Sequence, residues 1–117
     1  MDLREWIEKV QDIGDLKIVY GADWNLEIGA ISDLNAKRRG PALLFDRIKD
    51  YPEGYRVLTC ALSGPKRLAL TLNLPTNLDH QGLVSALSGK PAEWEARAKD
   101  FPPRVVSDGP VLENIQR

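Results

Sequence analysis

The segment Trp24–Pro52 constrains the fold most strongly, because a helical pattern in it runs directly into a buried strand. Its first half, WNLEIGAISDLNAKRR, carries apolar residues at the spacing of one helical stripe. This spacing predicts a helix whose buried stripe consists of Leu26, Ala30, Ile31 and Leu34. We expect a side-chain oxygen of Asp23 or Asn25 to cap its first turn.

Gly40 and Pro41 mark the end of that helix. Glycine can adopt the left-handed conformation that stops a helix, and proline cannot continue one. The run Ala42–Phe45 that follows is short, continuous and apolar, which is typical of a strand buried on both faces. A helix that returns into a buried strand predicts α/β layering.

Similar patterns predict the elements on either side. An Asp-x-x-Glu pattern starts a helix at Asp2, Gly14 ends it, and an alternating strand follows over 16–20. A Pro- and Gly-containing turn over 50–54 leads into a strand over 56–61, which we expect to pair antiparallel with the Phe45 strand. Later helices are predicted after Pro65, after Asn77 or Asp79, and for one or two turns over 94–98.

These elements predict a single α/β domain, in which helices pack on a small mixed sheet. We assign residues 1–101 to the domain and residues 102–117 to a connector, because the sequence becomes rich in Pro from Pro102 onwards. The apolar segment Val111–Ile115 near the end of this connector favours a chain that continues into a larger protein. The expected core comprises Leu26, Ile31, Leu34, Leu43, Phe45, Val57 and Leu58.

Composition limits the class of protein. With 43% hydrophobic and 28% charged residues, the 117-residue chain is globular rather than disordered. Its net charge of −1 argues against general binding to nucleic acid or to acidic membranes. Its one cysteine rules out an intrachain disulfide and fits a reducing compartment, so we expect a cytoplasmic location.

Two residues could carry chemistry, but a structural interpretation is favoured for each. His80, the one histidine, could be an acid/base group, yet no nucleophile pattern accompanies it, so we expect a surface side chain at a helix start. Cys60 lies within the apolar run VLTCAL and is interpreted as a small core residue rather than a nucleophile. One histidine and one cysteine also argue against a zinc site.

Two short motifs suggest anion binding. Lys37, Arg38 and Arg39 could grip phosphate or pair with acidic groups of another domain, but cations in a last helical turn are commonly solvated and favoured by the helix dipole. Ser88-Gly89-Lys90 resembles the end of a nucleotide-binding loop, but Val84 and Pro91 stand where that loop needs glycine and Ser or Thr. Neither motif predicts a site.

Five sequence blocks, in order along the chain, resemble the start of the UbiD-family decarboxylases. They are DLREWIEKVQDIGDLKIV, WNLEIGAISDLNAKRRGPALLFDRI, Y-P-x-G-Y-R-V-L, G-P-K-R-L-A-L-T-L and S-D-G-P-V-L-E-N. Each block alone is weakly specific, but the series spans nearly all 117 residues in the family's order. The resemblance implies the N-terminal α/β domain of a longer enzyme.

The resemblance also implies an activity. UbiD-like carboxy-lyases perform reversible, non-oxidative decarboxylation of aromatic or α,β-unsaturated carboxylic acids. They use prenylated flavin mononucleotide (FMN), bound with a divalent metal (Mn or Mg) and often with K, and the full-length enzyme is expected to be a homo-oligomer. The family's Glu-Arg-Glu network and flavin-binding residues lie in a downstream domain with no counterpart here. No catalytic, cofactor-binding or metal-binding residue is therefore assigned, and the chain alone is expected to be inactive.

A second hypothesis belongs to a different class. The chain could be a stand-alone accessory or scaffold subunit that has the same fold and binds a partner protein. A reading frame that continues towards a flavin-binding region would favour the enzyme domain, and a stop codon after Arg117 would favour the accessory subunit.

Overall fold

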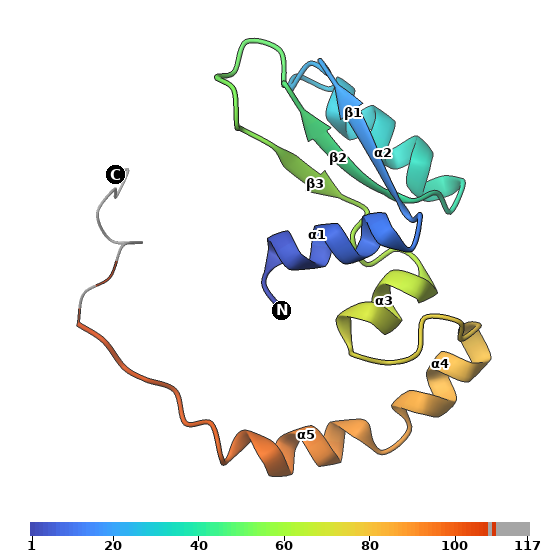
Figure 1. Cartoon of the computed structure of the whole chain (residues 1–117), viewed down its shortest axis with the longest axis vertical. Coiled ribbons are helices and arrows are strands. Elements are labelled where there is room, and N and C mark those ends of the chain that lie inside the picture. Colours follow the sequence, from blue (N-terminus) through green and yellow to red (C-terminus); the bar gives the residue numbers. More distant parts are fainter. Residues whose placement is uncertain (108, 110–117) are drawn as a thin grey trace. The chain divides into compact units, whose positions relative to one another are not determined.

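The computed structural model describes residues 1–107 and 109, and it divides the chain into two compact units, 1–86 and 87–117 (Figure 1). The first contains nearly all of the regular structure. The elements, in chain order, are α1 (Leu3–Asp12), β1 (Leu16–Tyr20), α2 (Glu27–Lys37), β2 (Ala42–Asp46), β3 (Val57–Thr59), α3 (Pro65–Thr71), α4 (His80–Leu87) and α5 (Lys90–Ala98).

The three strands form one mixed sheet in the order β1-β2-β3. β1 and β2 are parallel, with Ile18 opposite Leu44, whereas β2 and β3 are antiparallel, with Leu44 opposite Leu58. All four residues of Ala42–Phe45 are buried, so β2 is the central strand and is covered on both faces. The predicted α/β class, the buried strand and its antiparallel neighbour are confirmed.

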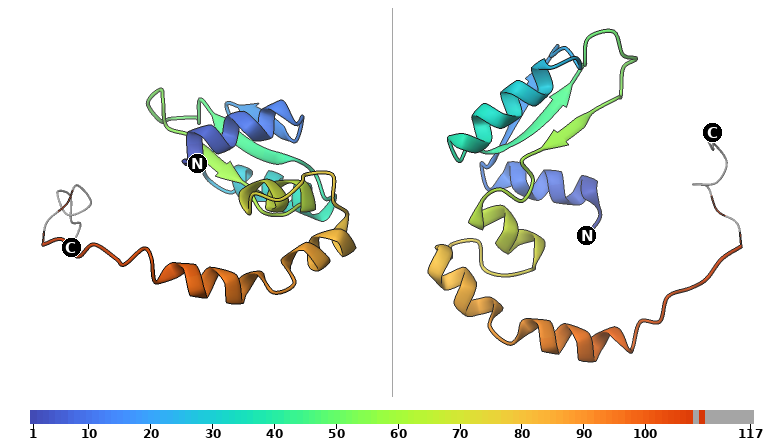
Figure 2. Two further views of the ribbon diagram at one scale, coloured as in Figure 1. Left: turned by 60° about the horizontal axis from the view of Figure 1, so that its bottom comes forward. Right: turned by 180° about the vertical axis from the view of Figure 1, so that it is seen from behind.

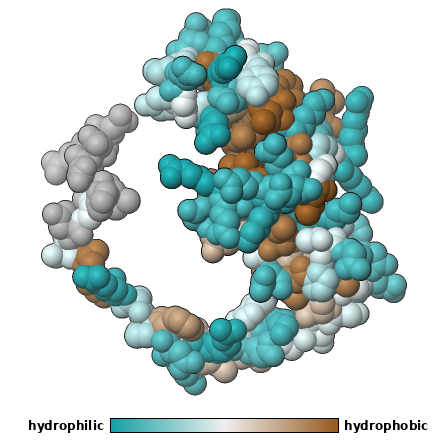
Figure 3. Space-filling view, viewed as in Figure 1, coloured by the Kyte–Doolittle hydropathy of each residue, from teal (hydrophilic) through white to brown (hydrophobic). Residues whose placement is uncertain are grey.

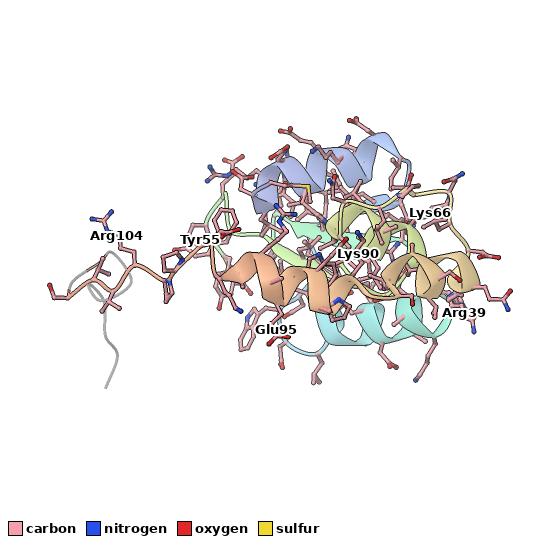
Figure 4. The ribbon with its side chains drawn as sticks, turned by 90° about the horizontal axis from the view of Figure 1, so that it is seen from below. Arg39, Tyr55, Lys66, Lys90, Glu95 and Arg104 are labelled. Carbon is pink, nitrogen blue, oxygen red and sulfur yellow. The ribbon has the colours of Figure 1, made fainter. Side chains whose placement is uncertain are left out.

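Alternate residues of β2 divide the core into two clusters. Leu43 and Phe45 join Ala22 and Ile48, and the partly buried Ile28 and Ile31 of α2 pack against them. On the other face, Ala42 packs with Trp6 and Val10 of α1. The sheet therefore lies between α2 on one side and α1 on the other, as the view from below in Figure 4 shows, and Figure 2 gives two further views of the same elements.

Three of the residues expected in the core are exposed. Leu26 is 81% exposed, Leu34 56% and Val57 39%, whereas Leu43 and Phe45 are in the core and Ile31 and Leu58 pack against it. Of the predicted stripe of α2, Ile31 faces the core, whereas the assignment of Leu26, Ala30 and Leu34 to the buried face was wrong. The face towards the sheet is made by residues 28, 31, 32 and 35, and two of these are polar.

The polar members of that face satisfy backbone and side-chain groups of the strands. The Ser32 hydroxyl lies 2.8 Å from the Thr59 hydroxyl, and Asn35 Nδ2 donates to the carbonyl of Pro41 over 2.8 Å. A polar group can be buried at low cost when it has a hydrogen-bond partner. A search for apolar residues alone could not find this face.

The start of α2 differs from the expected cap. The helix begins after Leu26, which has φ 66° and ψ −35°, and the N–H of Glu27 donates to the carbonyl of Asn25 over 2.8 Å. A bond between residues two apart, around a central residue of positive φ, defines the rare and strained form of γ-turn. Neither Asp23 nor Asn25 caps the helix, and a bulky exposed leucine occupies the strained position.

The other helix ends follow the sequence more closely. Asp2 Oδ1 accepts hydrogen bonds from the N–H groups of Arg4 and Glu5, so the predicted cap of α1 is confirmed. At the end of α2, the left-handed residue is Arg39 (φ 53°) rather than Gly40. Gly40 is needed for space, because a Cβ there would lie 2.1 Å from Asn35 Oδ1.

β3 is shorter than expected and α5 is longer. Cys60 has φ 57°, which an extended strand does not allow, so β3 ends at Thr59. In the second unit, α5 starts at Lys90 after Gly89 (φ 79°), with a proline in its first turn, and has nine residues. The assignment of 1–101 to a domain and 102–117 to a connector stays a prediction, and Val111–Ile115 lies outside the described residues.

A buried arginine joins three parts of the first unit. Arg67 of α3 is 2% exposed, its Nη1 lies 2.5 Å from Asp15 Oδ2, and its Nη2 donates to the carbonyl of Gly40 over 3.1 Å. It thus connects α3 to the α1–β1 turn and to the α2–β2 junction. Arg67 Nε is buried and has no hydrogen-bond partner among the residues that the structure describes, so the charge depends on these two contacts.

We expect Asp15→Asn to lower the free energy of unfolding by about 3 kcal/mol, because it leaves a buried cation without its counter-ion. Arg67→Met should cost less, because it removes the cation and leaves a carboxylate that is 24% exposed and can be hydrated. Lys37→Met is the control: it breaks an exposed ion pair and should cost less than about 0.5 kcal/mol. Urea unfolding measures all three, and equal values for Asp15→Asn and Lys37→Met would contradict the assigned role.

The γ-turn makes a second prediction. Leu26→Gly should leave the free energy of unfolding unchanged or raise it, because relief of backbone strain offsets the greater freedom of glycine in the unfolded chain. Leu34→Gly removes an exposed leucine from inside α2 and should lower stability by about 1 kcal/mol. Thermal unfolding of the two variants tests this, and a Tm for Leu26→Gly at or below that of Leu34→Gly would argue against strain.

Candidate docking surface

The structure keeps the sequence candidates apart. His80 is exposed at the start of α4, whose first turn is capped by Asp79 Oδ1 accepting from the N–H of Gly82. The interpretation of His80 as a surface side chain at a helix start is confirmed. Cys60 is half-buried just beyond β3, rather than in the core, and its Sγ lies 3.6 Å from the Ser32 carbonyl. That contact is structural.

The charged motifs are solvated, as the favoured interpretation predicts. Lys37 pairs with Asp33 one turn earlier at 2.6 Å, and Arg39 points away from the ribbon at the end of α2 (Figure 4). Lys90 pairs with Glu93 at 2.6 Å within the first turn of α5 (Lys90–Ala98). Within its own unit, each of these cations therefore already has a partner or extends into water.

Among the residues that the structure describes, no three His, Cys, Asp or Glu side chains come together as metal ligands would. These residues do not fit the divalent metal, Mn or Mg, that the family resemblance implies, and we place no cofactor on them. None of the helices in the described part is both long enough and apolar enough to cross a membrane.

An exposed cluster of aromatic residues is the most distinctive surface of the first unit. Trp24 and Tyr51 meet edge-on with ring centroids 6.5 Å apart, and Tyr51 and Tyr55 are tilted with centroids 5.9 Å apart. Their exposed fractions are 58%, 48% and 60%. With Ile28 and Val57 they line a hollow of about 190 Å³, and we call these five residues the aromatic face.

The aromatic face lies where two loops meet beside the end of the sheet. Trp24 precedes α2, and Tyr51 and Tyr55 belong to the β2–β3 loop, with Tyr55 at the outer margin of the ribbon (Figure 4). Ile48, at the floor of the hollow, is 6% exposed and belongs to the core cluster beneath. The face is therefore supported from below by packed side chains.

Charged groups hold the loop that carries Trp24. Asp23 accepts from the N–H of Asn25 over 2.9 Å and pairs with Lys49 Nζ at 2.9 Å, while the N–H of Asp23 donates to Glu27 Oε2 over 2.6 Å. The Asn25 N–H, and then the Lys49 ammonium, lower the pKa of the Asp23 carboxyl from its ordinary value. The pKa of Lys49 is raised, chiefly by its hydrogen bond to Asp23.

A second apolar surface lies over the face of the sheet towards α1. Figure 3 shows apolar side chains exposed between the β2–β3 loop and α1. A hollow of about 240 Å³ there has Leu44 and Leu58 in its wall and Arg4 and Arg56 among its lining residues. Neither arginine forms an ion pair within the described part of the chain.

The aromatic face is suited to binding another molecule rather than to catalysis. Aromatic residues and arginine are enriched where proteins contact each other, and the surface has no nucleophile, base or metal-ligand set to act on a substrate. The sequence analysis did not identify the face. The available signal was three aromatic residues flanking the central helix and strand, at Trp24, Tyr51 and Tyr55.

Comparisons with known proteins match most of the chain. Residues 7–87 match the family model of the 3-octaprenyl-4-hydroxybenzoate carboxy-lyase N-terminal domain (UbiD_N). The chain is 35% identical to a pyrrole-2-carboxylic acid decarboxylase of Pseudomonas aeruginosa, over 98% of this chain and 24% of that protein. It thus spans about a quarter of the length of that relative.

The chain is also similar to solved structures of a decarboxylase. The vanillic acid decarboxylase of Sedimentibacter hydroxybenzoicus in its open form is 29% identical, with a TM-score of 0.66 over 74% of this chain and 18% of that one. Its closed form is 28% identical, with a TM-score of 0.59 over 91% and 21%. The family match covers more than half of the chain. The chain therefore belongs to the UbiD family, of which it has the N-terminal domain.

Proposed function

We propose that this chain is the N-terminal structural domain of a UbiD-like carboxy-lyase, which carries out reversible, non-oxidative decarboxylation of aromatic or α,β-unsaturated carboxylic acids. The observation that carries the proposal is the 35% identity to a pyrrole-2-carboxylic acid decarboxylase over 98% of this chain. That relative and the vanillic acid decarboxylase are both named for removal of a carboxyl group from an aromatic ring.

The catalytic centre belongs to the part of the enzyme that follows this domain. Prenylated FMN, with Mn or Mg and with K, would bind there and supply the electron sink for loss of carbon dioxide. Residues 1–117 would supply architecture: they support one wall of the enzyme and contact the flavin-binding part. The full-length enzyme would be a cytoplasmic homo-oligomer.

The test begins with the full-length gene product, purified after co-expression with a flavin prenyltransferase. We expect a chain several times heavier than 13.1 kDa, a visible flavin spectrum, and release of carbon dioxide from pyrrole-2-carboxylate, vanillate or an α,β-unsaturated acid. Intact mass spectrometry, absorption spectroscopy and a substrate panel measure these three properties.

Two results would contradict the proposal. Flavin-dependent turnover by purified residues 1–117 would place the active site in this domain. A colourless native product of about 13.1 kDa would instead favour the accessory subunit, whose partner could then be isolated by affinity purification.

A further inference from the structure

We infer that the aromatic face is the surface on which the flavin-binding catalytic part of the same enzyme docks. This inference rests on the proposed function, and it assigns to a defined surface the contact that the proposed function requires. It follows from the packing of the face, from the strained backbone beside it, and from the length of the relatives.

The face is organised as a contact surface before any partner is present. Three rings that are about half exposed already contact one another, so little rotamer freedom remains to be lost when they are covered. Tyrosine and tryptophan combine a large apolar area with a polar tip, which suits a surface that is hydrated in one state and covered in another. The hollow among them would take one apolar side chain.

A strained turn lies on one of the two loops that build the face. Leu26, between Trp24 and Ile28, has φ 66° and ψ −35°, whereas Arg47 and Asp50 of the β2–β3 loop have positive φ, as Arg39, Cys60 and Asn73 have elsewhere in the unit. The turn at Leu26 costs free energy and persists only where the surrounding structure holds it. The γ-turn holds the Leu26 side chain 81% exposed, and this side chain belongs to neither core cluster of the described residues.

The relatives indicate the occupant. This chain corresponds to 24% of the pyrrole-2-carboxylic acid decarboxylase, so most of that polypeptide remains to pack against its counterpart. A partner in the same polypeptide acts at an effective concentration in the millimolar range, which outcompetes a second copy at micromolar concentration. Arg56 lines the hollow without an ion pair in the described part of the chain, and it would meet carboxylate or carbonyl groups at the rim.

Other hollows of the first unit fit this occupant less well. The one between α1 and α3 is lined by Glu5 and Lys9, which already neutralise each other at 2.8 Å. The hollow over the sheet shares Arg56 with the aromatic face, but it has no aromatic side chain. The aromatic face combines exposed rings that contact one another with the strained turn at Leu26.

The experiment uses the full-length enzyme with a photo-crosslinking residue, p-benzoyl-phenylalanine, in place of Tyr55. The matched control carries it in place of Leu62, which is 58% exposed and lies in the hollow with Leu3 and Trp6, away from the aromatic face. A mixture of ¹⁵N-labelled and unlabelled chains distinguishes crosslinks within one chain from crosslinks between chains. Mass spectrometry of the digested products then identifies the partner peptide.

We expect the Tyr55 variant to crosslink within one chain to a peptide beyond residue 117, with a yield at least five-fold above that of the Leu62 variant. Crosslinks between chains at the same position of each would show a self-association surface and overturn the inference. Equal yields at both positions, or products confined to residues 1–117, would also overturn it. Because the readout needs no flavin, a crosslink without activity would refute the proposed chemistry and leave the docking surface intact.

Discussion

The contact of Arg67 with Asp15 and with the Gly40 carbonyl is the interaction on which the rest of the structure depends. It brings together three chain segments: the turn before β1, the junction before β2, and α3. The first two are also joined by the N–H of Ala42, which donates to the carbonyl of Asp15 over 2.9 Å. A cation that is 2% exposed is tolerated where its partners are fixed, so this contact favours folding of the three segments as one unit. Arg67 contacts the residue before β1 and the junction before β2, and it thereby holds the first residues of these two parallel strands side by side.

Sequence reasoning succeeded where apolar runs and breaker residues coincide. Ala42–Phe45 is buried on both faces, Asp2 caps α1, and Pro65 opens α3, because each of these depends on local chemistry alone. It failed where tertiary placement decides. The inward face of α2 uses Ser32 and Asn35, which are acceptable only because Thr59 and the Pro41 carbonyl meet them.

The candidate surface could not be predicted for a related reason. Trp24, Tyr51 and Tyr55 are separated in the sequence. They meet because β1 and β2 are parallel, so that the segment after β1 and the loop after β2 leave the sheet at the same end. Arg67 carries no sequence signal either, since a charged residue in a short helix is normally solvated. The family resemblance, by contrast, depended on the order of motifs and was independent of these contacts.

The order of the sheet has a consequence for handling the domain by itself. β1 is an edge strand, so one side of Leu16–Tyr20 presents backbone N–H and C=O groups without a ladder partner in the sheet. Open edges of this kind can pair with another chain and lead to aggregation, and Lys17 is the one charged side chain along this edge. An isolated domain with an open edge and exposed aromatic rings has two routes to self-association. Its solubility at millimolar concentration would therefore depend on the charge of Lys17 at the β1 edge and on whether a partner covers the aromatic face.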